Sequence, residues 1–343
     1  MAVTIRQVAK RAGVSCATIS RVINNSDTVK PKTRDHVIKI IKEMGYAPNE
    51  VARSLSKNET KTIGVVVPDI NNPFFGDVIK GVSMLADEHN LNILLCDTNE
   101  DTEKEKNSLR MLKDHRIRGI IIGPASDNNE FNGEYLSILE NLGIPIVLVG
   151  RDVKYSNFDG VFIDNVQGAS DGVTALIQNG HKKIAVIAGS TDSKPGRDRL
   201  GGYMKAMAMG GLTVREDYIL HGNFKLESGY ELTCQLLEIE DRPTAIFTCN
   251  NMMTLGCIKA LSEQGLKIPE DMALVGFDEI ELLEIFNMQI TVIARPTFEM
   301  GRIAMEMLLE RFDKRENQGS ATKRITLNAE LKCKGSERFV HRD

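Results

Sequence analysis

The stretch TIRQVAKRAGVSCATISRVINNS, residues 4–26, has the spacing of two short helices joined by a tight turn. Thr4 and Gln7 form a Thr-x-x-Gln capping box, in which each side chain can satisfy an unpaired backbone amide at the start of a helix. Gly13 permits the turn that ends this helix. Ser15 is a suitable N-cap for a second helix over residues 16–24. The stretch therefore predicts a helix-turn-helix.

A third helix follows, with Pro31 in its first turn and Gly45 just beyond its end, positions that suit these two residues. Ala9 is small where the first two helices must cross, and Ile19 and Val22 would seat the second helix on the first. We therefore expect a compact three-helix unit over residues 1–47.

The front of the chain is basic although the whole chain is acidic. Residues 1–61 hold 12 Lys and Arg against five Asp and Glu, a local charge of +7, whereas the 343-residue chain carries −4 and its remainder −11. A basic helix-turn-helix predicts DNA binding, because cationic side chains meet phosphates. The alternative is a small helical cap whose charges only face solvent.

In a helix-turn-helix the second helix lies in the major groove, and residues at its beginning reach base edges. Arg21 can donate two hydrogen bonds to guanine, whereas Cys16 and Ala17 offer apolar or weakly polar contact. Thr18, Ser20, Asn24 and Thr33 are suited to phosphates. The residues of this unit that we predict to bind DNA are Thr4, Ser15, Cys16, Ala17, Thr18, Ser20, Arg21 and Asn24.

From Thr62 onward, apolar strands alternate with amphipathic helices, which is typical of parallel sheets buried on both faces. The expected strands are 62–70, 92–97, 119–124, 145–150, 160–165, 183–189, 218–223, 244–250 and 272–278, with one more helix and a strand near the end. So many strands exceed one open sheet, and we predict an α/β fold of two doubly wound subdomains.

Several functional classes are disfavoured. The six cysteines include no C-x-x-C pair, so neither a disulfide framework nor a metal site is expected, and no cofactor is implied. We find no G-x-G-x-x-G or G-x-x-x-x-G-K-[ST] motif and do not expect an enzyme. No apolar run reaches the ~18 residues of a membrane helix, and no signal peptide is evident, so we expect a cytoplasmic protein rather than a secreted transport protein.

The segments VTIRQVAKRAGVSCATISRVINNS, NEVARSLSKNETKTIGVVVPDINNPFF, GHKKIAVIAG, GRDRLGGYMKAM and LVGFDEI closely resemble the LacI/GalR family of bacterial transcription regulators, along essentially the whole chain. The resemblance implies a helix-turn-helix domain at 1–47, a hinge helix and linker at 48–61, and an effector-binding and dimerisation domain of the periplasmic-binding-protein type at 62–343. Its N-subdomain would span about 62–161 and 294–321, and its C-subdomain about 162–293 and 322–343.

The same resemblance assigns roles to the linker. It implies that Leu55 wedges into the minor groove at the centre of the operator, and that Asn49 and Arg53 face phosphates or groove edges. An apolar wedge of this kind is offset by the contacts that a kinked duplex permits. The resemblance also implies a homodimer on a near-palindromic operator, since two-fold protein symmetry matches half-site symmetry.

The resemblance further implies an effector cleft between the two subdomains. Phe224 would stack on the ligand, Arg197 would donate hydrogen bonds, and Asp278 would accept them. Alternatives remain open: Phe75 as a core residue, Asp164 as a helix cap and Arg199 as a structural ion-pair partner. The predicted effector-binding residues are Asp69, Phe74, Phe75, Arg151, Asp164, Arg197, Phe224, Asn250 and Asp278.

Two positions depart from the family pattern. Gly150 stands where many relatives have an acidic residue, and Asn251 stands where Asp is usual. Both changes make the cleft less acidic, which leads to the hypothesis that the ligand bears a carboxylate, phosphate or carbonyl. The sign of regulation stays open: a sugar that releases DNA, or a corepressor such as a purine or a phosphorylated phosphocarrier protein that tightens binding.

Overall fold

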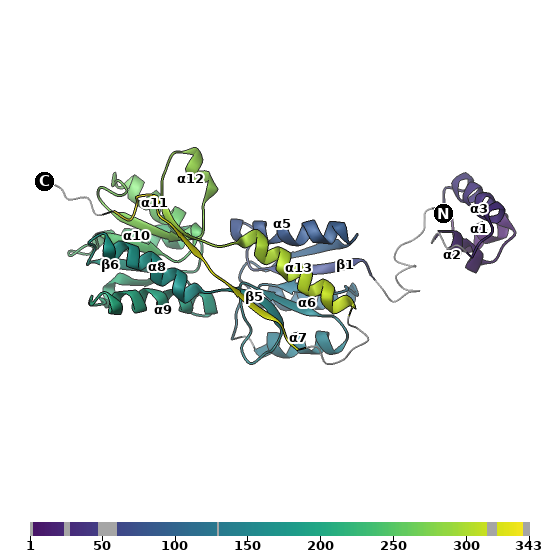
Figure 1. The fold of residues 1–343 in the computed structure, drawn as a ribbon, viewed down its shortest axis with the longest axis horizontal. Helices are drawn as coiled ribbons and strands as arrows, with labels where there is room; N and C mark the ends of the chain where they lie inside the picture. The colour runs from purple at the N-terminus through teal and green to yellow at the C-terminus, as the bar shows by residue number, and fades with distance from the viewer. Residues whose placement is uncertain (1–2, 24–27, 47–59, 129, 314–320, 339–343) are drawn as a thin grey trace. The chain divides into compact units, whose positions relative to one another are not determined.

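The computed structural model describes residues 3–23, 28–46, 60–128, 130–313 and 321–338. The chain divides into two compact units, Met1–Thr60 and Lys61–Asp343. Figure 1 shows the helices and strands of both units.

The first unit contains the three predicted helices, α1 (Ile5–Ala12), α2 (Cys16–Ile23) and α3 (Pro31–Glu43). The Thr4–Gln7 capping box is formed, and Gly13 ends α1 in the left-handed conformation with φ of 63°. Pro31 opens α3. The helices enclose a small core of Val8, Ala9, Ala12, Ile19, Val22, Val37 and Ile40. The predicted helix-turn-helix is therefore confirmed; residue 24 lies outside the described residues.

The second unit contains two six-stranded sheets, each in its own lobe. The first sheet is parallel throughout, in the order β11-β5-β4-β3-β1-β2. Its strands are β1 (Thr62–Val67), β2 (Asn92–Asp97), β3 (Ile120–Ile122), β4 (Ile146–Val149), β5 (Asp159–Ile163) and β11 (Arg324–Leu327).

The second sheet has the order β12-β10-β9-β8-β6-β7, and only its edge strand β12 is antiparallel. Its strands are β6 (Ile184–Ala188), β7 (Ile219–His221), β8 (Ala245–Thr248), β9 (Ala273–Phe277), β10 (Thr291–Ala294) and β12 (Glu330–Lys332). All nine strands predicted from apolar runs are present, whereas β10 and one of the two C-terminal strands were not predicted.

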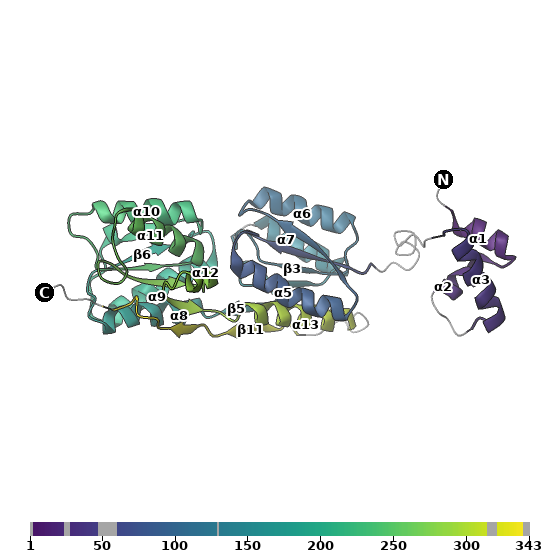
Figure 2. The same cartoon turned by 90° about the horizontal axis from the view of Figure 1, so that it is seen from above.

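Helices cover both faces of each sheet (Figures 1 and 2). The first lobe has α5 (Pro73–Glu88), α6 (Thr102–Asp114), α7 (Glu130–Asn141) and α13 (Thr297–Asp313). The second lobe has α8 (Asn165–Gln178), α9 (Lys194–Met209), α10 (Leu226–Glu238), α11 (Asn251–Glu263), α12 (Glu281–Ile285) and the 3₁₀ turn η1 (Glu216–Tyr218). In β1, Val65 packs in the core on one face and Val66 in the core on the other. This burial on both faces explains the continuous apolar runs.

The chain passes between the lobes after β5, after β10 and after β11. This topology corrects one predicted boundary: residues 322–343 were assigned to the second subdomain, but β11 pairs in parallel with β5 of the first sheet. The crossover after β5 comes at Asp164, since β5 ends at Ile163 and α8 begins at Asn165. The first lobe therefore draws its edge strand and helix α13 from the far end of the chain.

Two glycines allow α5 and α13 to pack in close contact. A Cβ on Gly81 would fall on the backbone oxygen of Phe298, and a Cβ on Gly301 would fall on the backbone oxygen of Val78. Figures 1 and 2 show the two helices side by side. The absence of side chains at these positions sets the distance between the helices.

We predict that Gly301→Ala lowers the free energy of unfolding by about 1–3 kcal/mol, because the added methyl group forces the helix backbones apart. The measurement is the urea unfolding midpoint. Gly76→Ala in α5 is the matched control, since a Cβ there meets nothing within 4 Å. Equal midpoints for the Gly301 variant and the wild type would contradict this account of the α5–α13 contact.

Candidate functional site

Helix α2 exposes one face to solvent. Cys16, Ala17, Ser20 and Arg21 are exposed, while Ile19 is fully buried beneath them. These exposed residues recur at three- and four-residue spacing, which places them on one side of the helix. The residues predicted to contact bases are therefore all exposed on the same side of α2.

The remaining residues predicted to contact DNA do not share the exposed face of α2. The Ser15 hydroxyl caps α2, accepting from the Thr18 amide at 3.1 Å. Thr4 is occupied in the capping box of α1. Thr33 is half-buried near the start of α3. Asn24, Asn49, Arg53 and Leu55, with the predicted hinge helix, lie outside the described residues. The DNA contacts themselves remain predictions.

In the second unit, cavities lie between the two lobes. The central cavity, of about 30 Å³, is lined by Asn72, Phe74, Phe75, Gly150, Arg151, Pro195, Arg199, Phe224, Asn250, Asp278 and Arg295. Each of these residues lies in a segment that follows the carboxyl end of a strand, where open α/β sheets bind ligands. The lining combines aromatic rings with a few converging polar groups, as ligand sites do.

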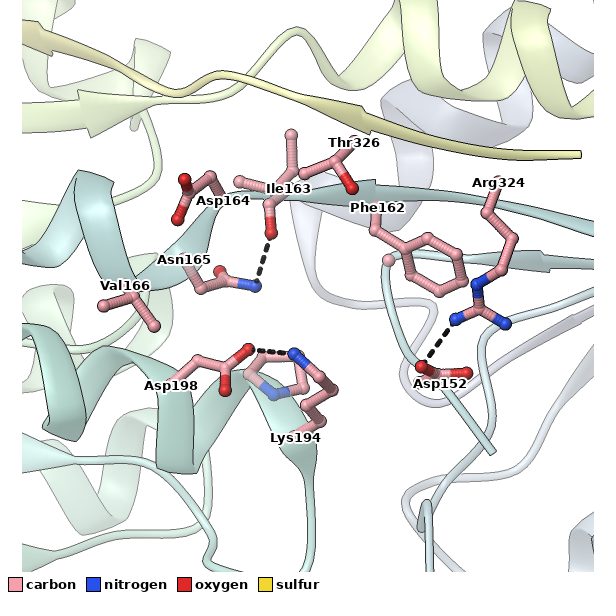
Figure 3. A pocket seen from close by; sticks show the side chains of 12 residues that line it. Asp152, Phe162, Ile163, Asp164, Asn165, Val166, Lys194, Asp198, Arg324 and Thr326 are labelled. Carbon is pink, nitrogen blue, oxygen red and sulfur yellow. Dashed lines mark hydrogen bonds and ion pairs between the residues drawn. The ribbon is translucent and has the colours of Figure 1, made fainter. Parts of the chain in front are cut away.

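Two neighbouring cavities adjoin the central one. The hinge-side cavity, of about 250 Å³, shares Gly150 and Pro195 with it and lies beside the crossover from β5 to α8 (Figure 3). The outer cavity, of about 340 Å³, shares Phe74, Asp278 and Arg295 with it. The cleft thus holds three adjoining cavities, of which the central one is the smallest.

The predicted aromatic residues line the central cavity. Phe74 and Phe75 open α5 and meet edge to face, with ring centroids 4.7 Å apart. The guanidinium carbon of Arg295 lies 3.7 Å from the Phe74 centroid. Phe224, from the other lobe, is 8% exposed. Phe75 is both a core residue and part of the lining, so its two predicted roles are compatible.

Two cavity residues have left-handed backbones. Phe224 has φ of 66°, which a bulky residue rarely adopts, and Asp278 has φ of 77°, a region that Asp adopts more readily. Hydrogen bonds hold both: the Asn250 amide donates to the Phe224 carbonyl at 2.8 Å, and the Asp278 amide donates to the Ile293 carbonyl at 2.9 Å. Backbone strain of the kind seen at Phe224 clusters at functional sites, and it supports a binding role for this residue.

Arg151 lies in the cavity as predicted, but it is already paired. Its guanidinium donates to both carboxylate oxygens of Glu100, at 2.7 and 2.6 Å, and to the carbonyls of Pro124 and Ala125. This fork-to-fork geometry holds Arg151 rigidly in place. The positive charge of Arg151 is therefore already balanced by Glu100 and is not free to balance the charge of a ligand.

The structure corrects the prediction for Arg197. This residue pairs with Asp127 of the other lobe and donates to the Thr191 carbonyl at 2.7 Å, and it lines none of the three cavities. Arg199 lines the central cavity instead and is 3% exposed. Arg199 is also not an ion-pair partner, because it donates to Asn165 at 2.9 Å and to the Cys249 carbonyl at 2.6 Å.

Asp278 forms an ion pair with Arg295, and each side chain is 5% exposed. Sequence reasoning missed Arg295, which follows the unpredicted strand β10. A signal was present, since an Arg directly after the apolar run TVIA stands at a carboxyl strand end. The second Asp278 oxygen, Oδ2, is buried and without a hydrogen bond within the described chain.

The other predicted effector residues have local structural partners. Asp69 accepts from the Asn71 amide at 2.9 Å and lines none of the three cavities, so the structure does not bring it to the site. Asp164 caps α8 and lines the hinge-side cavity. Asn250 caps α11 and lines the central cavity. Asn251 donates to Asn72 at 3.1 Å, which links the two lobes.

A buried carboxyl group binds Ala125, whose carbonyl accepts a hydrogen bond from Arg151 of the central cavity. Glu105 of α6 is fully buried and accepts from the Ala125 amide at 2.7 Å and from the Asn132 amide nitrogen. Burial raises the pKa of Glu105 to about 7, against the lowering effect of these donors. The Asn132 side-chain oxygen is buried without a hydrogen bond, so a flipped Asn132 amide would accept a hydrogen bond from the O–H group of neutral Glu105.

One hydrolase-like pattern is also present. Residues 168–172 read GASDG, which matches G-x-S-x-G. Ser170, however, is buried within helix α8 rather than at an exposed strand-to-helix turn. Among the residues that the structure describes, we find no cluster of His, Cys, Asp and Glu that could hold a metal. No described helix is long and apolar enough to span a membrane.

The sequence matches the family model described as "Periplasmic binding proteins and sugar binding domain of LacI family" over residues 60–334, and the model "Bacterial regulatory proteins, lacI family" over residues 4–49. The chain belongs to the LacI family. LacI-family proteins are DNA-binding transcription regulators, and the second unit has the fold of their sugar-binding domain.

Named LacI-family relatives are similar along nearly the whole chain. The transcriptional regulator RegA of Clostridium saccharobutylicum is 37% identical over 317 residues, covering 92% of this chain and 94% of that protein. The repressor PurR of Vibrio campbellii (strain ATCC BAA-1116) is 37% identical over 315 residues, covering 92% and 93%. The lac repressor dimer bound to operator and the anti-inducer ONPF superposes with a TM-score of 0.82 at 25% identity, covering 99% and 100%. These relatives are regulators rather than enzymes.

The Glu105 geometry gives a pH-dependent prediction. Because its folded pKa lies above the ordinary value of 4.5, this group's contribution to stability is complete below about pH 4.5 and is lost as the pH rises towards 7. Glu105→Gln keeps a neutral group able to bond to Ala125 and to a flipped Asn132. We expect it to match the wild type at pH 4.5 and to exceed it at pH 8 by up to about 3 kcal/mol.

The measurement is the urea unfolding midpoint between pH 4.5 and 8. Glu103→Gln is the matched control on the same helix, because the Glu103 side chain is 69% exposed. A stability difference between the Glu105 variant and the wild type that does not change with pH would show that Glu105 is charged or neutral throughout this range.

Proposed function

We propose that this regulator is a repressor that binds a near-palindromic operator as a homodimer and is released when a small sugar or sugar-derived ligand binds in the cleft. The observation that carries the proposal is the central cavity, whose aromatic and polar lining comes from both lobes. A ligand there interacts with both lobes at once, so its affinity depends on how the lobes are arranged. We further propose that the protein acts in the cytoplasm and has no catalytic role.

The DNA side of the proposal rests on the exposed face of α2. Cys16, Ala17 and Arg21 are the proposed base-reading residues, and Thr18 and Ser20 are proposed to meet phosphates. The similarity to the lac repressor dimer, which is described in complex with operator, supports the dimer and its DNA partner. The proposed contacts from Asn24, Asn49, Arg53 and Leu55 concern residues outside the described chain.

The second candidate is a regulator whose DNA affinity rises with a corepressor. The 37% identity to a repressor named PurR supports this second candidate. Both candidates use the same cleft and differ only in which DNA-binding state the ligand prefers.

The test begins with an operator selected from a random duplex pool by the full-length protein. Ligands are found by thermal shift, and operator affinity is then measured by mobility shift with and without each binding compound. We expect a bound sugar or sugar derivative to weaken operator binding by about 5- to 150-fold, the usual range of allosteric coupling. Tighter operator binding would establish the corepressor alternative, and unchanged binding by every ligand would contradict both.

Arg21→Ala tests base recognition. We predict a loss of about tenfold to a hundredfold in affinity for the selected operator, because a bidentate contact to a base contributes about 1–3 kcal/mol, with little change on random DNA. Lys39→Ala is the control, since Lys39 lies on α3 and is exposed. Equal losses on operator and random DNA would assign Arg21 to phosphate contact instead.

A further inference from the structure

The charges that line the central cavity are unbalanced. Three guanidinium groups line it, those of Arg151, Arg199 and Arg295, against the single carboxylate of Asp278. Glu100 neutralises Arg151 from behind. Asp278 neutralises Arg295. The cavity therefore retains one uncompensated positive charge, which belongs to Arg199.

Arg199 is a buried cation with neutral partners only. Its Nε donates to the Asn165 side-chain oxygen and its Nη1 donates to the Cys249 carbonyl. Its Nη2 makes no hydrogen bond with any residue of the described chain. The ring of Phe277 lies 3.9 Å from its guanidinium carbon, so an aromatic face supports the group. A buried charge without a counter-ion is costly, and an incoming anion would relieve that cost.

The hinge-side cavity has the opposite polarity. Figure 3 shows its carboxylates, Asp152, Asp164 and Asp198, from three different segments. Arg324 pairs with Asp152 at 2.6 Å, and Lys194 pairs with Asp198 at 2.5 Å. No cation of the described chain pairs with Asp164. This larger cavity thus presents hydrogen-bond acceptors and a net negative charge beside the positive central cavity.

We propose that the ligand of this cleft is a sugar acid, a polyhydroxylated molecule with one carboxylate, and this inference rests on the proposed function of the cleft. The carboxylate binds in the central cavity to Arg199, whose planar guanidinium matches it. A hydroxyl group donates to the unpartnered Asp278 Oδ2. The remaining hydroxyls extend into the hinge-side cavity, towards Asp164.

The charge pattern also orients the ligand. The reverse placement would bring the carboxylate against the carboxylates of the hinge-side cavity and leave Arg199 without a counter-ion. The volumes agree with this orientation, because the central cavity of about 30 Å³ suits a small planar group whereas the hinge-side cavity of about 250 Å³ has room for the polyol. A phosphate is larger than a carboxylate and fits the central cavity less well.

The test compares acids with their neutral counterparts on the full-length protein. Isothermal titration is carried out with glucuronate and glucose, galacturonate and galactose, and gluconate and glucitol, with glucose 6-phosphate as the phosphate arm. We expect at least one acid to bind ten times more tightly than its neutral counterpart, with an affinity that falls as NaCl concentration rises.

Arg199→Gln removes the uncompensated charge and keeps an amide that can donate to Asn165. We expect this variant to reduce acid affinity at least tenfold and to bring the acid and neutral affinities close together. If the first variant does not fold, Arg295→Gln is a second variant: it leaves Asp278 without its counter-ion in the same cavity, and we expect the unpaired carboxylate to reduce acid affinity more than neutral-sugar affinity. Arg215→Gln is the matched control, because Arg215 lies in an exposed ion pair of the same lobe and should leave acid binding unchanged.

The inference is overturned if a neutral sugar binds as tightly as its acid, if glucose 6-phosphate binds more tightly than every acid, or if no acid binds. These outcomes are separate from failure of the proposed function. An acid that binds without changing operator affinity contradicts the proposed function alone, whereas a neutral sugar that releases the operator contradicts the inference alone.

Discussion

Burial of both faces of the two parallel sheets is the constraint on which the rest of the second unit depends. Apolar strands such as β1 and β4 leave no solvated face, so helices must cover each sheet on both sides. The polar groups needed for binding are consequently confined to the strand ends and the segments that follow them. The central cavity is lined by such segments from both lobes, which brings residues distant in sequence, such as Phe74 and Asp278, together.

Local features of the sequence predicted the first unit well. The capping box at Thr4, the turn at Gly13 and the Pro31 helix start depend on contacts within a few residues, and each is present in the structure. The nine apolar runs predicted nine strands for the same reason. Strand β11 was assigned to the wrong lobe because its partner, β5, lies more than 150 residues away, and no local pattern encodes that pairing.

The candidate site could be predicted only in part. Phe74, Phe224, Asn250 and Asp278 follow strand ends, and the structure places all four at the cavity. The choice between Arg197 and Arg199 could not be made from motif spacing alone. Two positions that are two residues apart on a helix differ by about 200° around its axis, so Arg199 faces the central cavity and Arg197 points away from it. Only packing of α9 against Asn165 and Cys249 decides which.

The return of the chain through both lobes has a consequence for synthesis. The first lobe receives α13 and the edge strand β11 from residues 297–327, after all of the second lobe except its edge strand β12 has been made. During synthesis, a nearly complete second lobe therefore emerges from the ribosome while the first lobe still lacks helix α13. At that stage the edge of β5 that pairs with β11 is also unpaired. An open strand edge beside apolar surface invites association with other chains. The lobe that is made first thus cannot complete its folding until the C-terminal part of the chain reaches a sheet begun more than 200 residues earlier.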